Sequence, residues 1–156
     1  MAEGKRAAEG LNPLPMEATH LDYRISDDRS RVDFAVVHPW LTDAYWSPGI
    51  TREKVEQAAR HSALVVSAWH GDDQVGYCRA VSDRTRFAWL ADVFVAPAHR
   101  GRGLGRAIVQ FTLDHPDLAD VPNWLLGTLD AHGVYAELGF APPAQPERLM
   151  QLRRKK

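Results

Sequence analysis

A glycine- and arginine-rich segment, Arg100–Arg106, carries the clearest chemical signal in the sequence, with the order Arg-Gly-Arg-Gly-Leu-Gly-Arg. An apolar run precedes it, and apolar residues at helical spacing follow it, so we expect a strand, a turn and a helix. Glycines let a backbone approach a ligand closely, and the first amides of a helix have no partner within the helix. The arginines add positive charge at the positive end of the helix dipole. The segment therefore predicts a binding site for an anion such as a diphosphate.

Two common phosphate-binding motifs do not fit this segment. A P-loop requires Gly-x-x-x-x-Gly-Lys-Ser/Thr, and no lysine follows these glycines. A dinucleotide-binding Gly-x-Gly-x-x-Gly fingerprint fails in both registers, because Arg106 or Ile108 occupies the last glycine position. The remaining alternatives are a surface turn with solvated arginines and an Arg/Gly segment that contacts RNA. Arginine-rich tracts of the second kind are usually repetitive, whereas this one is single.

The segment resembles the cofactor loop of the GNAT acetyltransferase superfamily, whose pattern is Arg/Gln-x-x-Gly-x-Gly/Ala. Arg100, Gly103 and Gly105 match this pattern in register. A second stretch, residues 130–140, resembles the family's following strand-to-helix segment, with its tyrosine and terminal Gly-Phe. The two matches have the family's order and roughly its separation, and the resemblance covers about residues 20–152.

This resemblance implies an N-acyltransferase that uses coenzyme A, with acetyl-CoA as the donor, no metal, and direct transfer to an amine. It implies that backbone groups of one strand end pair with the pantetheine arm, and that amides of the glycine-rich turn hold the diphosphate. In the family, two parallel strands splay apart and the cofactor lies in the gap between them. The expected cofactor-binding residues are Val93, Phe94, Val95, Arg100, Gly101, Arg102, Gly103, Leu104, Gly105 and Arg106.

Acetyl transfer to an amine requires that the ammonium lose a proton and that the departing thiolate gain one or be stabilised. Tyr135 is the candidate for the second task, because a tyrosine in the matching family position commonly donates to the CoA sulfur. The alternative is that its ring packs against the sheet with Leu138 and Phe140. His132 could act as a base, but capping of the short helix is the preferred interpretation.

Asp92 interrupts an otherwise apolar strand three residues before its end. A buried carboxylate is costly unless it is paired, so its presence near the predicted cofactor gap requires a reason. It could accept the proton of the amine, directly or through a water, or it could bind a cationic acceptor. An ion pair with Arg79 or Arg84 explains it equally well.

Three aromatic residues, Trp40, Tyr45 and Trp46, are the candidates for binding the acceptor. The resemblance implies that they lie between the first helices, where the family usually lines its acceptor pocket. The following Ser-Pro-Gly at 47–49 places Trp46 at a mobile loop. Such rings could hold an aromatic or apolar amine, or they could cover the core.

The remaining pattern predicts a mixed α/β fold of the GNAT type, with antiparallel front strands, a splayed parallel central pair and flanking helices. Strand–helix–strand across residues 87–129 implies a parallel pair with a right-handed crossover. Thr51 is the expected N-cap of the second helix. We expect strands at about 21–25, 63–70, 75–81, 87–95, 124–129 and 148–152, and helices at about 32–45 (short or kinked at Pro39), 51–61, 104–115 and 132–138.

Composition sets the broad class of the protein. The 156 residues suffice for one domain, with apolar and charged contents of 45% and 25% that are ordinary for a globular protein. A net charge of -1 gives no general attraction to nucleic acid or to anionic membranes. Cys78 is the single cysteine, expected to be a buried structural thiol, and no Cys/His spacing suggests zinc. No membrane span or signal peptide is apparent, so we expect a cytoplasmic protein.

We expect residues 1–19 to form a disordered tail, in which Met16 is a second candidate start, and residues 20–156 to form the acetyltransferase domain. The expected function is N-acetylation of a primary amine of a small molecule, by a monomer or homodimer that binds neither nucleic acid nor membrane. The alternatives are a protein acetyltransferase, acting on an N-terminus or a lysine, and a non-catalytic acyl-CoA sensor.

Overall fold

The computed structural model describes residues 14–155, which form two compact units, one up to Leu126 and one from Gly127 on. The first unit is built on a sheet whose neighbouring strands are antiparallel, except for a parallel pair at its end. This mixed α/β architecture confirms the predicted fold class. The strands lie in chain order: β1 (Glu17–His20), β2 (Tyr23–Ser26), β3 (Leu64–His70), β4 (Asp73–Ser82), β5 (Ala88–Val95) and β6 (Trp124–Leu125).

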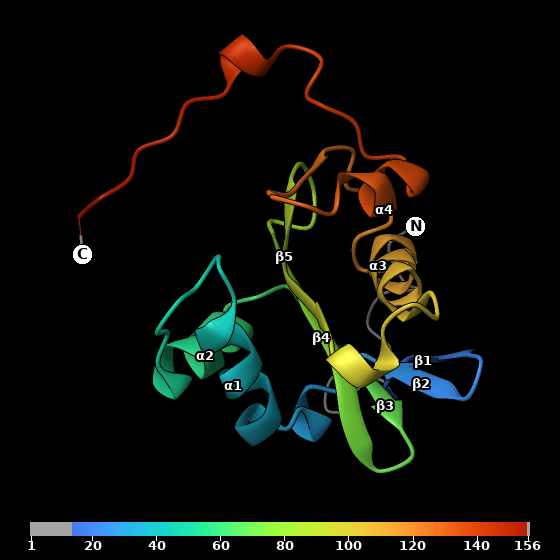
Figure 1. Cartoon of the computed structure of the whole chain (residues 1–156). Helices are drawn as coiled ribbons and strands as arrows, with labels where there is room; N and C mark the ends of the chain where they lie inside the picture. Colours follow the sequence, from blue (N-terminus) through green and yellow to red (C-terminus); the bar gives the residue numbers. More distant parts are fainter. Residues whose placement is uncertain (1–13, 156) are drawn as a thin grey trace, which may run out of the picture. The chain divides into compact units, whose positions relative to one another are not determined.

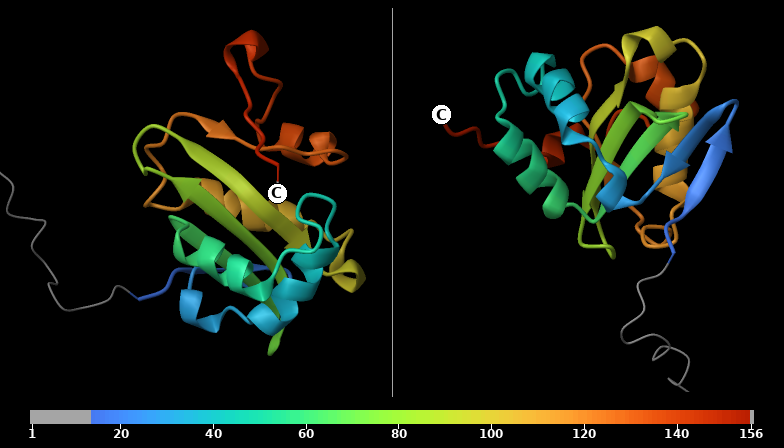
Figure 2. Two further views of the ribbon diagram at one scale, coloured as in Figure 1. Left: turned by 90° about the vertical axis from the view of Figure 1, so that its left-hand side faces the viewer. Right: turned by 90° about the horizontal axis from the view of Figure 1, so that it is seen from below.

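Helices cover both faces of this sheet. In Figure 1, α1 (Phe34–Asp43) and α2 (Arg52–Arg60) lie on one side of the strands and α3 (Leu104–Asp114) lies on the other. Figure 2 shows the same layers of the first unit from two further directions. The predicted N-cap Thr51 begins α2: its side chain accepts a hydrogen bond from the Lys54 amide at 3.3 Å. Pro39 lies inside α1, as the sequence predicted.

Alternate residues of β4 pack against opposite layers. Tyr77 belongs to a buried cluster under α1 and α2, together with Val37, Leu41, Val55, Ala59 and Val65. Gly76 and Cys78 face α3 instead. A Cβ on Gly76 would lie 2.6 Å from Cδ1 of Ile108 and 3.0 Å from the Cβ of Ala68, so a larger residue here would have to displace the Ile108 side chain. Burial raises the pKa of the Cys78 thiol to about 12, and the prediction of a buried thiol is confirmed.

The start of the sheet differs from the prediction. Residues 17–19 belong to β1 rather than to a disordered tail, and the strand expected at 21–25 is the second half of a hairpin. Leu21 lies in the hairpin turn with φ 53° and is 71% exposed. The two strands are joined at their open end, where the Asp27 amide donates to the Met16 carbonyl at 3.2 Å. This pairing across the turn has no local sequence signal. The rest of the predicted tail, residues 1–13, lies outside the described residues.

The second unit contains α4 (His132–Glu137), as predicted, and a short 3-10 helix at Pro146–Arg148. The strand expected at 124–129 is only two residues long, Trp124–Leu125. The strand expected at 148–152 is absent, and Leu149 and Met150 are 52% and 98% exposed. An alternating apolar pattern forms a strand only where another strand pairs with it, and the described chain supplies none here.

Candidate functional site

β5 contains a β-bulge at Asp92. Tyr77 pairs with Phe94 and Arg79 with Ala91, so two steps along β4 correspond to three along β5. Asp92 has φ 55°, in the left-handed region that residues other than glycine seldom adopt. A bulge bends its strand and increases the local twist, so β5 changes direction before its last three residues.

Beyond the bulge, β5 has a strand partner on one side only. β6 pairs with β5 at Ala88 and Trp89, and no further β6 pairing follows in the described chain. The carbonyl of Val95 accepts a hydrogen bond at 2.9 Å from Nε of Arg100, a side chain rather than a strand. The two parallel strands therefore separate after a short contact. The segment 93–95 lies along the separated part, and the family resemblance implies that this segment pairs with a pantetheine arm.

The glycine-rich segment forms an open turn at the start of α3. Gly101 and Gly103 have φ of 80° and 75°, and Gly103 is the N-cap of α3 with no side chain capping the helix. No backbone amide from Gly101 to Gly105 donates a hydrogen bond to another described residue. A Cβ built on Gly101 would have no heavy atom within 4 Å, so the turn is not covered there. Free amides at a helix N-terminus form a binding site for an anion.

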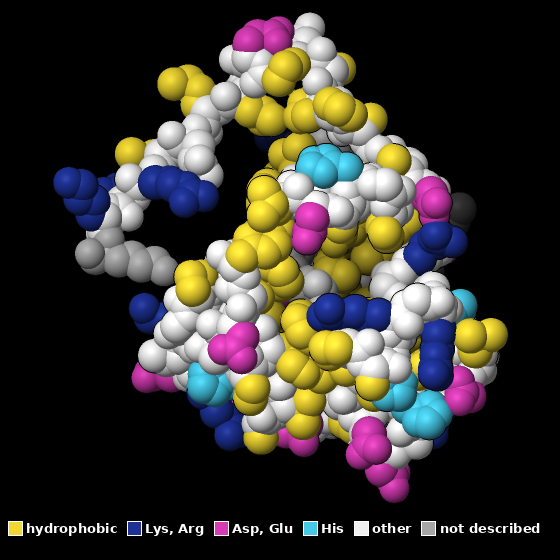
Figure 3. Space-filling model, in the orientation of Figure 1, with side chains coloured by type: hydrophobic (Ala, Val, Ile, Leu, Met, Phe, Trp, Pro, Cys, Tyr) yellow, Lys and Arg dark blue, Asp and Glu magenta, His cyan; other side chains and the backbone are white. Residues whose placement is uncertain are grey.

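The side chains around the turn bond to one another and to carbonyls, leaving the amides free. Arg100 lies over the Phe94 ring, with 5.1 Å between its guanidinium carbon and the ring centre. Arg102 donates to the Tyr23 hydroxyl at 3.0 Å, and His20 donates to the Arg102 carbonyl at 2.7 Å. In Figure 3, Lys and Arg side chains (dark blue) lie near histidines (cyan) on this side of the first unit. The turn thus combines unbonded donors with positive charge.

Both carboxylate oxygens of Asp92 are engaged. Nε of Arg79 donates to Oδ2 at 2.7 Å, and Nε1 of Trp46 donates to Oδ1 at 2.9 Å. The ion pair is largely buried, with side chains 18% and 11% exposed for Arg79 and Asp92. Of the two arginines expected as alternatives, Arg79 therefore forms the pair, whereas Arg84 donates to the Ala63 carbonyl.

The predicted acceptor-binding aromatics gather along β5. Trp40 stacks on Phe94, with 4.9 Å between ring centroids and an interplanar angle of 20°. Trp46 reaches Asp92, and Tyr45 meets the Trp46 ring edge-on at 5.0 Å. Tyr45 and Trp46 are 50% and 42% exposed, so they present ring surface to solvent beside the bulge.

Sequence reasoning missed the Tyr77 hydroxyl, which is buried beneath α1 and α2 without a hydrogen-bond partner in the described chain. Burial is the main cause that raises its pKa, and the nearby Asp92 carboxylate raises it further. It also missed Tyr23 and His99, which lie next to the turn. No spacing rule could have found them, because their partners are distant in sequence.

Tyr135 belongs to the second unit. Its ring meets Phe140 at 5.9 Å with an interplanar angle of 75°, so part of the packing alternative is observed. Its proton-donor role stays a prediction. His132 is the first residue of α4, whose N-cap is Ala131, and no side chain caps this helix. The interpretation of His132 as a cap is therefore wrong, because its side chain makes no bond to the first amides.

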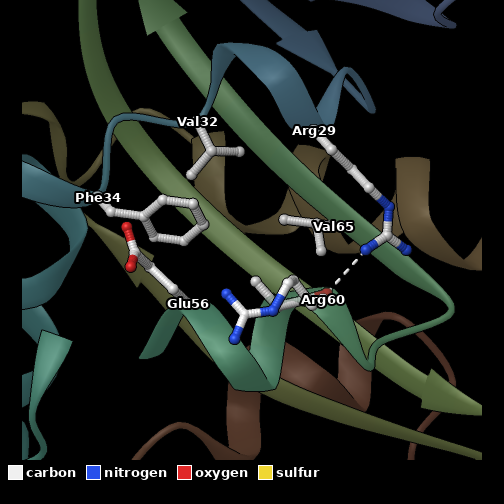
Figure 4. A pocket seen from close by; sticks show the side chains of 7 residues that line it. Arg29, Val32, Phe34, Glu56, Arg60 and Val65 are labelled. Atoms are coloured by element: carbon white, nitrogen blue, oxygen red, sulfur yellow. Dashed lines mark hydrogen bonds between the residues drawn. The ribbon is translucent and has the colours of Figure 1, made fainter. Parts of the chain in front are cut away.

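A cavity of about 250 Å³ lies away from the turn, between α2 and the segment 29–34. Figure 4 shows its lining, in which Phe34, Val32 and Val65 are apolar. Its Arg29 donates to the carbonyls of Ala59, at 2.7 Å, and Ser62, which end α2. This arginine therefore caps a helix, and none of the predicted site residues lines the cavity.

Two further properties concern the described residues as a set. Residues 14–155 contain no group of His, Cys, Asp and Glu side chains arranged to hold a metal ion. None of their helices has the length and apolar character that a membrane span requires.

Comparison with known proteins shows what the chain as a whole is similar to. Residues 23–140 match the Acetyltransferase (GNAT) family. The "Uncharacterized N-acetyltransferase ycf52" of Porphyra purpurea is 30% identical over 93 residues, which are 56% of this chain and 53% of that protein. The protein of the same name from Pyropia yezoensis is 29% identical over the same shares. The chain thus spans about half the length of these curated relatives.

Solved structures extend the likeness over most of the chain. A crystal structure from Xanthomonas campestris pv. campestris, assigned to the GNAT family, is 39% identical with a TM-score of 0.81, and the match covers 85% of this chain and 93% of that one. A GNAT family acetyltransferase from Streptococcus pneumoniae is 22% identical with a TM-score of 0.65, over 86% and 97% of the two chains. The second likeness bears on the fold alone.

Proposed function

Because this chain belongs to the GNAT acetyltransferase family, we propose that it transfers an acetyl group from acetyl-CoA directly to the primary amine of a small molecule. Membership of the family supports an acyltransferase, and the family in general uses acetyl-CoA. One observation carries the proposal. The amides from Gly101 to Gly105 lie at the start of α3 and donate no hydrogen bond to another described residue. A diphosphate is the part of CoA that such a turn would bind.

The diphosphate would be held mainly by main-chain donors. A charged acceptor strengthens each hydrogen bond relative to a neutral one, and the positive end of the α3 dipole adds to the attraction. Gly101 and Gly103 supply left-handed backbone angles that aim successive amides outward. Arg100 and Arg106 contribute positive charge close to the same point.

The pantetheine arm would lie along the separated part of β5. Its amide groups would bond to backbone groups of residues 93–95 as an added strand does. The Val95 carbonyl already accepts from Arg100, so an arm amide that bonds there must displace that guanidinium. The displaced Arg100 would then be available to the phosphates, which couples binding of the arm to binding of the diphosphate.

The chemistry would take place at the bulge. A carboxylate there attracts a cationic amine, and Asp92 would accept the proton directly or through a water. Arg79 offsets this charge and Trp46 occupies the second oxygen, so Asp92 also fixes the Trp46 ring beside the acceptor. Tyr135 would protonate the departing thiolate, a role that rests on its match to the family motif. Replacement of Asp92 by Asn should lower kcat while acetyl-CoA affinity is kept.

The half-exposed rings of Tyr45 and Trp46 favour a small aromatic or apolar amine as acceptor. A panel of amines, tested with acetyl-CoA by release of the CoA thiol, identifies the class, and a dipeptide series in parallel tests a protein acceptor. Turnover with free amines supports the proposal, and turnover with dipeptides alone replaces it by protein acetylation. Binding of acetyl-CoA without turnover would indicate a sensor. No binding of any acyl-CoA by folded protein overturns the proposal.

A further inference from the structure

A polar network lies beside the glycine-rich turn and has no part in the proposed chemistry. Arg102 donates from Nη1 to the Tyr23 hydroxyl at 3.0 Å. The same hydroxyl lies 2.8 Å from Nδ1 of His99. Tyr23 has no exposed surface, so its hydroxyl bonds to these groups without competition from bulk water. In Figure 3, the histidines (cyan) and arginines or lysines (dark blue) at the lower right lie over the strands labelled β1 to β3 in Figure 1.

The chemistry of the three groups sets the direction of the network. A guanidinium can only donate, so the Tyr23 oxygen accepts from Arg102. The hydroxyl then has one hydrogen to give, and Nδ1 of His99 is the acceptor within reach. The Tyr23 hydroxyl thus accepts one hydrogen bond and donates another, so each of the three groups acts in a role that it can fill.

The Tyr23 ring is held by packing as well as by its hydroxyl. His70 and His99 both lie 5.5 Å from it, centroid to centroid, and 5.3 Å from each other. His70 in turn donates to Asp22 at 2.8 Å, and this hydrogen bond is the main cause that lowers the pKa of the Asp22 carboxyl. The Tyr23 ring is therefore in contact with two neighbouring imidazoles, and its hydroxyl is hydrogen-bonded as well.

Arg102 is the residue that these contacts restrain. It stands between Gly101 and Gly103, both at positive φ, where the chain has the most conformational freedom to lose. Its side chain is bonded to Tyr23, and its carbonyl accepts from His20 at 2.7 Å. Both the side chain and the carbonyl of Arg102 are therefore hydrogen-bonded to the β1–β2 hairpin.

We propose that Tyr23 and His20 are positioning residues for the cofactor turn: they fix Arg102 and thereby hold the amides of Gly101–Gly105 in the conformation that binds a diphosphate. The proposal rests on the function proposed above. A turn that is ordered before binding loses less entropy when the ligand arrives, so loss of a restraint lowers affinity for the part of the ligand that the turn contacts.

The test compares a ligand that contains the diphosphate with one that lacks it. Tyr23→Phe removes the hydroxyl and keeps the ring. We expect the Kd of CoA, measured by calorimetry, to rise about tenfold, the typical loss of one hydrogen bond to a charged group. The KM for acetyl-CoA should rise while kcat is unchanged. Turnover of S-acetylpantetheine, which has no diphosphate, should be unaffected.

Two further variants separate positioning from general damage. Tyr77→Phe removes the same hydroxyl from an equally buried tyrosine whose hydroxyl has no partner in the described chain, and it should leave the CoA affinity unchanged. In an Arg102→Gln background, Tyr23→Phe should add nothing to the loss, because the restrained guanidinium is already gone. If Tyr23→Phe does not fold, His20→Ala at a partly exposed position should give the same pattern.

The outcomes distinguish this inference from the proposed function. Wild-type protein that binds no CoA overturns both. Wild-type binding that Tyr23→Phe leaves unchanged overturns the positioning role alone. An equal loss with CoA and S-acetylpantetheine, or a loss that adds fully to that of Arg102→Gln, also contradicts it, because either result indicates damage that does not act through the turn.

Discussion

Replacement of Gly103 by alanine should weaken cofactor binding by more than its effect on the stability of the fold explains. Gly103 has φ 75°, where an L-residue is strained, and a Cβ there would lie 3.4 Å from Nε2 of His20. Gly71, in the β3–β4 turn, has φ 60° and no heavy atom within 4 Å of its Cβ. Replacement of either glycine by Ala costs about 1–2 kcal/mol through the left-handed backbone. Only Gly103→Ala changes the anion site.

The expected changes in Tm follow from the length of the chain. For 156 residues, an unfolding entropy of about 2.1 cal/mol/K per residue gives about 0.33 kcal/mol/K. Each alanine variant should then lower the Tm of the free protein by roughly 3–6 °C. Acetyl-CoA at a hundredfold excess over its Kd stabilises wild-type protein by about 2.7 kcal/mol, which raises the Tm by about 8 °C.

Gly103 is the N-cap residue of α3, so relief of the left-handed strain at an alanine there should move the first amides of the helix. Gly103→Ala should therefore lose about 2.3 kcal/mol of binding, the size of one charge-assisted hydrogen bond. The Kd then rises about fiftyfold, and the same ligand concentration raises the Tm by only about 2 °C. Differential scanning fluorimetry measures both quantities. Gly71→Ala should keep the full ligand shift. A full shift with Gly103→Ala, or equal losses in both variants, would refute the assignment of the turn.

Three other predictions concern single side chains. Tyr135→Phe should lower kcat with an unchanged Kd for CoA, and unchanged turnover would leave Tyr135 a packing residue. Asp83 accepts hydrogen bonds from the amides of residues 85–87, which lowers its pKa to about 2, so its stabilising effect is present above about pH 4 and is lost between about pH 4 and pH 2. The Tm advantage of wild-type protein over Asp83→Ala should disappear in that window; an advantage independent of pH would contradict this. Burial raises the pKa of Cys78 to about 12, so a thiol reagent at pH 8 should label it only in unfolded protein, and rapid native labelling would show that the core opens there.

Local features of the sequence predicted local structure well. Glycines at 101 and 103 predicted an open turn because only a few residues can adopt those backbone angles, and Thr51 marked the start of α2 because its hydroxyl bonds to an amide three residues later. The β-bulge at Asp92 had no such marker. It depends on the register between β4 and β5, which neighbouring residues do not encode.

Contacts between residues that are distant in the chain could not be predicted from the sequence. Trp46 bonds to a carboxylate 46 residues away, and Arg102 bonds to a hydroxyl 79 residues away, so no spacing rule connects them. The absent strand at 148–152 has the same origin: its alternation is real, but a strand also requires a partner, and the described chain offers none.

The most direct measurement is of the amides themselves. In a ¹⁵N-labelled sample titrated with CoA, the resonances of Gly101, Gly103 and Gly105 should shift in a saturable way, because their N–H groups gain a charged acceptor. Pantetheine, which has no diphosphate, should leave them in place at a concentration that saturates its own binding. If CoA binds while these three resonances stay unmoved, the turn does not hold the diphosphate, and the account of the site is wrong.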